Sequence, residues 1–251
     1  KRMKIRMYNV GFGDCFCLRD RKKSLLVDFG TNNSRIEGRP RREIFDVIIS
    51  DLSTIKSKNL LLTHFHMDHL SGLLYMMKKK DISVDFGKIY LPDVFSKKEM
   101  SRTLVLLLLA DLLKESGLPS RQVSLFALVD ALLENKQNVE LLSRGKLFEN
   151  KYQALWPDTD VIRKETDEVY NRICEDGKFK EVMDVLLEFA EKLRLIVWSM
   201  TAEGNKPAET VEKETDLTAS ELTEQPEVRQ KIIRAYVYER EFRRIKALPD
   251  F

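Results

Sequence analysis

The sequence contains few of the residues from which metal sites and disulfide bridges are usually built. Its 251 residues include only three histidines and three cysteines. An odd number of cysteines, with Cys15 and Cys17 separated by a single residue, matches no common disulfide framework. We therefore expect reduced thiols and a cytoplasmic location, because disulfides are rare in reducing compartments.

Long apolar runs are lacking as well. The longest one, around residues 104–110, is far shorter than the roughly 20 residues that a membrane-spanning helix needs. It predicts a buried helix and no association with a membrane. The basic start of the sequence is not followed by an apolar segment of the kind that a signal peptide contains.

The sequence has almost no excess of charge of one sign, since its formal net charge is +3. The whole-chain charge therefore gives no indication of a polyanionic partner. The charges are unevenly placed, however, with basic residues concentrated in 1–43 and acidic residues in 203–227. We interpret both clusters first as solvated surface. Contact of the RPRRE stretch at 39–43 with phosphate groups is the alternative.

The hydrophobic pattern of the first part of the chain predicts an α/β fold. Strands are predicted at 4–10, 15–19, 24–28, 59–63 and 88–92, and helices at 43–52 and 70–80. The continuous apolar run at 59–63 indicates a strand that is buried on both faces. Strands and helices that alternate in this way predict a layered α/β sandwich.

The pattern changes near residue 96, where helical spacing becomes dominant. Helices are predicted at 98–116, 121–136, 167–175, 179–200 and 227–247, with a hairpin at 145–156. Residues 203–226 are acidic and poor in apolar side chains, which indicates a flexible linker. We expect a first domain at 1–157, including the helices at about 98–136, and a mostly helical insertion at 158–251.

All three histidines lie in the segment THFHMDHLSG, directly after a predicted strand. The segment places four potential metal ligands within six positions: His64, His66, Asp68 and His69. Imidazole nitrogen and carboxylate oxygen are common ligands of Zn²⁺, and Mn²⁺, Fe and Ni²⁺ suit the same donors. Strand ends are also where α/β enzymes build their sites. The segment therefore predicts a metal site in preference to a surface loop that holds histidines by chance.

The pattern H-x-H-x-D-H after an apolar strand resembles the signature of the metallo-β-lactamase superfamily. Asp28 in LLVDFG resembles the first motif of that family, and YNVGFGDC at 8–15 resembles the V-G-x-G-D turn of one branch. This branch includes the nuclease-like domains of competence DNA-uptake proteins and hydrolases of antiviral defence gene clusters. The Leu-Trp-Pro sequence at 155–157 is similar to a strand end in the same branch.

The resemblance implies an αββα sandwich and a two-metal hydrolase, with zinc as the default metal. By family position, His64 and His66 would bind the first metal, and Asp68 and His69 the second. A hydroxide held between the metals would attack phosphorus or carbonyl centres, with Asp68 among the catalytic groups. Asp28 would not bind the metal itself but would hold the metal-binding side chains in place.

Asp14 lies in the turn of the first predicted hairpin, and its sequence position allows two interpretations. It either supports the metal site or faces the substrate, or it caps the backbone of its own turn.

The family also implies metal ligands further along the chain, which this sequence lacks because no histidine follows His69. We therefore expect the N-terminal half of the sandwich, with the C-terminal remainder of the same protein as its partner. The acidic linker is of a kind that proteases cleave, which suggests control by a regulatory protease. A truncated chain is the alternative.

Taken together, these patterns predict a metal-dependent hydrolase, with the phosphodiesters of DNA or RNA as the first choice of substrate. A small-molecule ester, amide or thioester is the alternative within the enzyme class. A regulatory or scaffold subunit with an incomplete metal site is the alternative outside it. The intact histidine cluster argues against a scaffold, which has no need of four ligands at this spacing.

Overall fold

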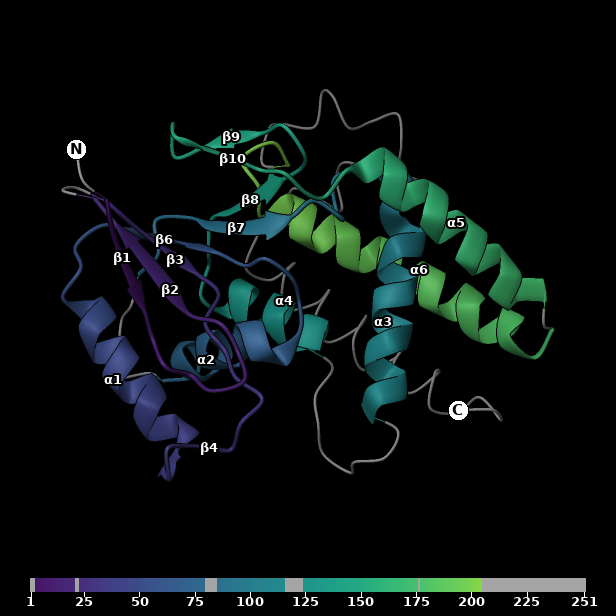
Figure 1. Ribbon diagram of the computed structural model, residues 1–251. Coiled ribbons are helices and arrows are strands. Elements are labelled where there is room, and N and C mark those ends of the chain that lie inside the picture. The colour runs from purple at the N-terminus through teal and green to yellow at the C-terminus, as the bar shows by residue number, and fades with distance from the viewer. Residues whose placement is uncertain (1–2, 21–22, 80–84, 116–123, 176, 205–251) are drawn as a thin grey trace. The chain divides into compact units, whose positions relative to one another are not determined.

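The structure, a computed structural model, describes residues 3–20, 23–79, 85–115, 124–175 and 177–204 (Figure 1). Nearly all of the predicted linker at 203–226, and the helix predicted at 227–247, lie outside these residues. The described residues form two compact units. The sheet unit comprises those of 1–93 and 111–158, and the helical unit comprises those of 94–110 and from Thr159 onward. The division into domains after residue 157 stays a prediction.

A mixed six-stranded sheet forms the centre of the sheet unit, in the strand order β1-β2-β3-β6-β7-β8. Its strands are β1 (Lys4–Met7), β2 (Phe16–Arg19), β3 (Ser24–Val27), β6 (Lys58–Leu61), β7 (Ile89–Pro92) and β8 (Val139–Leu142). β2 is antiparallel to both of its neighbours, β1 and β3, whereas β3, β6, β7 and β8 run parallel, as expected when helices connect them. The predicted α/β fold is confirmed, although the sequence pattern missed β8.

Three helices belong to the same unit: α1 (Arg41–Ser53), α2 (Met67–Met77) and α4 (Ser124–Glu134). The α1 helix packs against the start of the sheet, since Asp51 binds Arg6 of β1 at 2.8 Å and Arg19 of β2 at 3.1 Å. The α2 helix contacts both α1 and α4. On this side of the sheet, Cys17, Leu26 and Leu60 are fully buried. This face therefore forms the main core of the unit.

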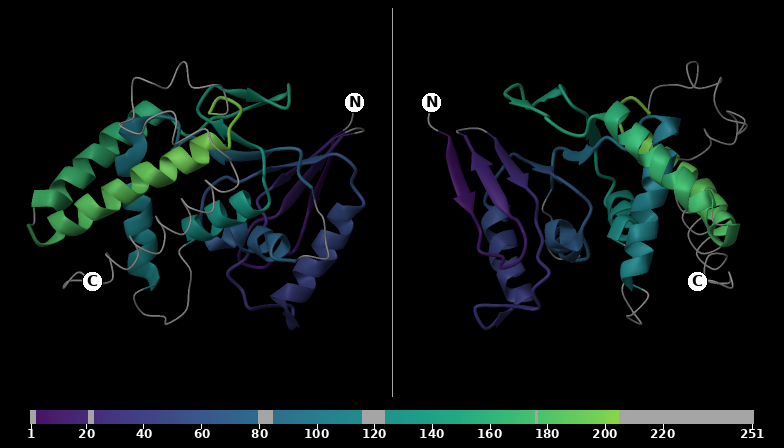
Figure 2. Two further views of the ribbon diagram at one scale, coloured as in Figure 1. Left: turned by 180° about the vertical axis from the view of Figure 1, so that it is seen from behind. Right: turned by 45° about the vertical axis from the view of Figure 1, so that its right-hand side comes forward.

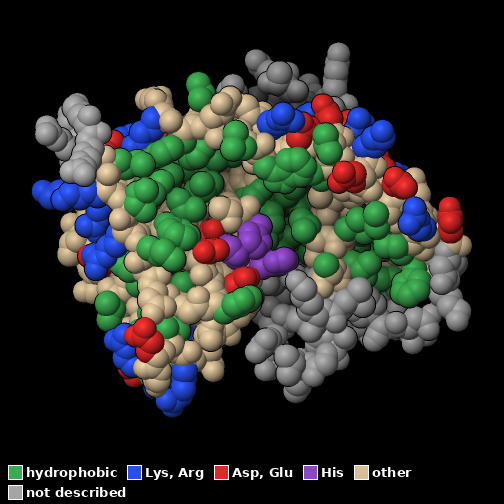
Figure 3. Space-filling model, viewed as in Figure 1, with side chains coloured by type: hydrophobic (Ala, Val, Ile, Leu, Met, Phe, Trp, Pro, Cys, Tyr) green, Lys and Arg blue, Asp and Glu red, His purple; other side chains and the backbone are tan. Residues whose placement is uncertain are grey.

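The opposite face of the sheet is only partly covered. A hairpin of β9 (Leu147–Phe148) and β10 (Tyr152–Gln153) packs on it and buries an apolar cluster made of Leu25, Tyr90, Leu142, Phe148 and Ala154. Beyond the hairpin, Ile5 and Met7 of β1 are 64% and 73% exposed. Figure 3 shows hydrophobic side chains gathered on this part of the surface.

The prediction that residues 59–63 are buried on both faces was wrong for the strand itself. Buried and half-buried residues alternate along β6, where Lys58 and Leu60 are buried while Asn59 and Leu61 are only half-buried. The physical reason is that one face of β6 lies in the buried core beneath the helices, whereas the β9–β10 hairpin covers the other face only in part.

In the helical unit, the chain forms η1 (Lys98–Met100), the first part of α3 (Ser101–Glu115), α5 (Thr159–Glu175) and α6 (Gly177–Ser199). Arg102 of α3 binds Asp167 of α5 at 2.8 Å and lies over the Tyr170 ring. Figure 2 shows these helices from two further directions. None of the described helices is long and apolar enough to cross a membrane.

The α2 helix contains a glycine whose replacement tests the packing of the core. A Cβ atom on Gly72 would lie 2.6 Å from two ring carbons of Phe29, which packs edge-on against Phe45 at 5.2 Å. An alanine in a helix usually adds up to about 1 kcal/mol of stability over glycine. Because overpacking a core costs about 1–3 kcal/mol, we expect Gly72→Ala to lower the free energy of unfolding by about 1–2 kcal/mol in urea titrations.

The double variant Gly72→Ala/Phe29→Leu is the control for this prediction, since the smaller leucine makes room for the added methyl group. It should lose less stability than the sum of the two single changes. A Gly72→Ala protein as stable as the wild type would show that Phe29 is not held as tightly as the structure indicates.

Candidate metal centre

Asp28 and His64 lie just beyond the carboxyl ends of two neighbouring parallel strands, β3 and β6. Val27 of β3 pairs with Leu61 of β6, and Asp28 follows directly with its N–H donating to the Leu61 carbonyl at 2.8 Å. His64 comes three residues after β6. Two segments that are distant in sequence therefore meet at the edge of the sheet where α/β proteins place their ligand sites.

Asp28 connects these segments through its carboxylate. The side chain is almost fully buried, and the backbone adopts a positive φ of 56°, which aspartate tolerates better than most residues. Its Oδ1 accepts a hydrogen bond from the Thr63 N–H at 2.8 Å, and its Oδ2 accepts one from the Thr63 hydroxyl at 2.7 Å. The same Oδ2 lies 2.9 Å from Nδ1 of His69. Asp28 thereby fixes the His69 ring and leaves its Nε2 free to face an ion.

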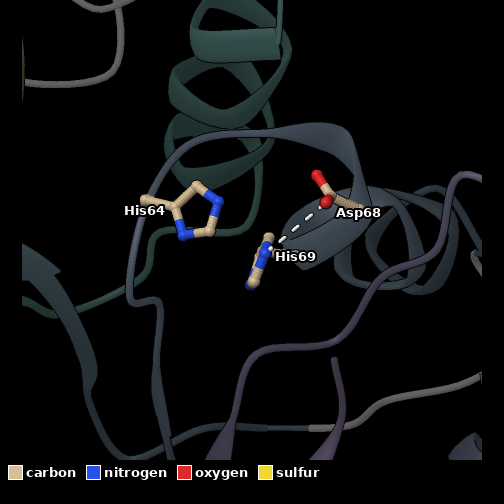
Figure 4. A group of neighbouring side chains, drawn as sticks. All are labelled: His64, Asp68 and His69. Carbon is tan, nitrogen blue, oxygen red and sulfur yellow. Dashed lines mark ion pairs between the residues drawn. The ribbon is translucent and has the colours of Figure 1, made fainter. Parts of the chain in front are cut away.

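Three of the four predicted ligands converge at this point. The ligand atoms of His64, Asp68 and His69 all lie within 4.8 Å of one another. Nε2 of His69 is 3.6 Å from Oδ2 of Asp68, and the rings of His64 and His69 are 3.6 Å apart between centroids. Figure 4 shows these three side chains turned toward one another. We refer to His64, Asp68 and His69 as the ligand triad.

His66 lies at the edge of this arrangement. It is exposed, its ring centroid is 4.9 Å from that of His64, and it belongs to neither group of candidate ligands found among the described residues. Its backbone has a structural role, because the His66 carbonyl accepts hydrogen bonds from the N–H groups of His69 and Leu70. These bonds begin α2, whose first turn therefore positions Asp68 and His69.

Asp14 also reaches the centre. Its Oδ2 lies 3.7 Å from Nδ1 of His69, and together with Asp28 and His69 it forms a second group of candidate ligands within 4.8 Å. Its N–H donates to the Asp68 carbonyl at 3.2 Å, and its own carbonyl accepts from the Gly30 N–H at 3.2 Å. The turn that carries Asp14 is thus bound to the segment that carries the ligand triad.

Two glycines make this close approach possible. A Cβ on Gly13 would lie 2.3 Å from the Gly30 carbonyl oxygen and 2.7 Å from that of Asp68. A Cβ on Gly30 would lie 2.6 Å from the Leu70 nitrogen. These are backbone atoms, which cannot move aside as a flexible side chain can. The backbone segments that carry Gly13, Gly30 and Asp68 therefore meet at a distance that only glycine allows.

Sequence reasoning missed Thr63, which supplies two of the hydrogen bonds to Asp28. It also missed Ser71, whose hydroxyl accepts from the Thr31 N–H at 2.9 Å and lies 3.0 Å from the Thr31 carbonyl. Thr63 directly precedes the histidine cluster, and this position was the one signal in the sequence that could have drawn attention to it.

The electrostatics of the centre favour the neutral form of the His64 imidazole. The pKa of His64 is lowered from its usual value, first by burial and then by the nearby His69 and His66 rings. Neutral imidazole is the form that binds a metal ion. Two imidazoles and one carboxylate, with one ring oriented by a buried aspartate, fit the nitrogen and oxygen donor set of a zinc-type ion.

Comparison with known families agrees with this geometry. Residues 8–93 match the model of the metallo-beta-lactamase superfamily. The match covers less than half of the chain, but it includes Asp14, Asp28 and the whole ligand triad. A comparison with curated proteins found no match. The assignment to the branch with nuclease-like domains stays a prediction.

The role of Asp28 can be tested by removing its charge while keeping its shape. We expect Asp28→Asn to weaken zinc binding by about 10- to 100-fold, the usual effect of losing a partner that orients a metal-binding histidine. Isothermal titration with a competing chelator would measure this change. Asp46→Asn on α1, where Asp46 binds Tyr75 and Lys79, is the matched control and should bind zinc like the wild type. Equal affinity in Asp28→Asn and the control would contradict the anchoring role.

Proposed function

We propose that this chain provides the metal-binding part of a metal-dependent hydrolase that cleaves phosphodiester bonds in DNA or RNA. The superfamily match of residues 8–93 suggests the hydrolase class. The observation that carries the proposal is the convergence of the ligand triad in front of the buried Asp28 carboxylate. Such a set of donors at a strand end is the arrangement that hydrolytic metal centres use.

In this proposal, the ligand triad would hold the metal, and His66 and Asp14 stand beside it. A bound metal ion supplies Lewis acidity and lowers the pKa of water toward neutrality. Asp28 holds the His69 ring in one orientation through Nδ1. Asp68 is partly exposed, and its carboxylate can accept a hydrogen bond from the attacking water and orient it.

Exposed basic residues in the segment that follows Asp28 support an anionic substrate. Arg35, Arg39, Arg41 and Arg42 lie on the short β4–β5 pair (Arg35–Ile36 and Arg39–Pro40) and at the start of α1, and all four are exposed. The loop before β4 is connected to the turn that carries Asp14, because Asn33 accepts a hydrogen bond from the Phe12 N–H at 2.6 Å. Clustered arginines attract the phosphates of a nucleic acid.

We further propose that the C-terminal remainder of the same protein covers the open face of the sheet and supplies further ligands. Sheets that are apolar on both faces are stable when a layer covers each of them. Ile5 and Met7 are exposed on this face, and Leu18, Val27 and Leu61 are half-buried. Cleavage in the linker by a regulatory protease would leave the two halves associated through this apolar surface.

The proposal predicts a metal-dependent activity that requires the ligand triad. Elemental mass spectrometry of the protein as isolated, paired with intact masses of every chain present, would give the metal content. Hydrolysis would be followed with labelled DNA and RNA and with a small ester. We expect His64→Ala and Asp68→Ala to lose bound metal and to lower phosphodiester hydrolysis by at least about 100-fold, since a metal supplies several kcal/mol of transition-state stabilisation.

The control is again Asp46→Asn, which should keep both metal and activity. Hydrolysis of the ester but not of the nucleic acids would favour the small-molecule alternative. A protein that binds no metal in any preparation, with every companion chain present, would favour the regulatory or scaffold subunit.

A further inference from the structure

Among the described residues, Phe12 is the most exposed aromatic residue near the metal centre. Its side chain is 73% exposed, although it lies only two residues before Asp14. A single exposed apolar residue is common on protein surfaces and needs no explanation by itself. Phe12 is different because its backbone is held on both sides.

Three hydrogen bonds fix the Phe12 backbone. Its N–H donates to Oδ1 of Asn33 at 2.6 Å, and its carbonyl accepts from the Asn32 N–H at 2.9 Å and the Thr31 hydroxyl at 3.2 Å. Gly11 before it adopts a φ of +71°, a conformation that glycine adopts easily. The turn therefore presents an aromatic ring to solvent with little freedom left in the backbone.

The same turn is tied to the ligand triad. Gly13 leaves no room for a Cβ beside the Asp68 carbonyl, and the Asp14 N–H donates to that carbonyl. The position of Phe12 relative to the metal ligands is thus fixed through two residues of backbone. A group that binds on the Phe12 ring would be held at a defined place next to the centre.

The basic residues of 35–42 are attached to this turn as well. Asn9, which precedes the turn, donates to Glu37 at 2.7 Å, and the Arg41 N–H donates to the Ser34 carbonyl at 3.0 Å. An exposed ring and a group of arginines therefore stand on one connected set of loops. Aromatic rings and basic side chains together are the means by which proteins bind single-stranded nucleic acids.

We propose that Phe12 is a stacking platform for an unpaired base, with the arginines of 35–42 contacting the backbone of the same strand. This inference rests on the proposed function and names its substrate class as single-stranded nucleic acid. A duplex would not fit this role, because both faces of its bases are covered by their neighbours in the stack. Stacking at Phe12 would position a nearby phosphodiester at the ligand triad.

The test is a binding measurement without turnover, on the full 251-residue chain in the presence of EDTA. The probe is a fluorescein-labelled single strand of about twelve nucleotides, compared with an abasic strand of the same length and with a duplex. We expect Phe12→Ala to weaken binding of the normal strand by about tenfold and to leave binding of the abasic strand unchanged. Phe12→Trp should bind the normal strand as well as the wild type does.

Two further variants make the comparison specific. Arg39→Gln should weaken the normal and abasic strands equally and reduce the dependence of affinity on salt, since it removes a phosphate contact. Val47→Ala, at a residue on α1 that is 59% exposed, is the matched control and should change neither affinity. Unchanged melting temperatures would show that each variant is folded.

The inference would be overturned if Phe12→Ala lost affinity equally for the normal and abasic strands, or lost affinity for neither. Tighter binding of the duplex than of the single strand would also overturn it. Failure of the proposed function is separate, because binding in EDTA does not depend on catalysis. A chain that binds single strands through Phe12 but hydrolyses none when loaded with metal would keep this inference and contradict the function.

Discussion

The buried Asp28 carboxylate joins three parts of the chain: the end of β3, the residue before the histidine cluster, and the first turn of α2. An isolated carboxylate in a protein interior costs several kcal/mol of desolvation unless it is hydrogen-bonded or paired. Thr63 supplies two hydrogen bonds, and His69 contacts the same carboxylate. The orientation of the His69 ring, and with it the geometry of the ligand triad, depends on this one group.

The backbone around Asp28 is arranged to make this contact possible. Parallel pairing of β3 with β6 sets the register that brings Asp28 to Thr63, and the glycines at 13 and 30 let three backbone segments approach one another. Asp14 and the exposed Phe12 ring are held on the same turn. The centre therefore lies at one edge of the sheet, beside a turn whose backbone is held in place. Hydrogen bonds connect the β4–β5 pair, with its basic residues, to this turn.

The sequence predicted the features that depend on neighbouring residues. The ligand segment was visible because four donors lie within six positions, and Asp28 was identified through the resemblance of LLVDFG to a family motif. Features that depend on contacts between distant residues were not predicted. Tertiary packing determines the order of the strands and the presence of β8 in the sheet. It also determines that Phe148 and Ala154 cover only part of the second sheet face. For the same reason, the sequence could not show that His66 lies outside the triad or that Gly13 touches the Asp68 backbone.

We propose that His64, Asp68 and His69 together hold one metal ion. X-ray absorption spectroscopy at the zinc edge of the zinc-loaded chain would identify the atoms that bind this ion. We expect nitrogen and oxygen neighbours at about 2.0–2.2 Å, with the outer scattering of imidazole rings. Cys15 and Cys17 are buried and should not contribute. A sulfur shell at about 2.3 Å, or a spectrum of water ligands without imidazole, would show that the ligand triad does not hold the metal.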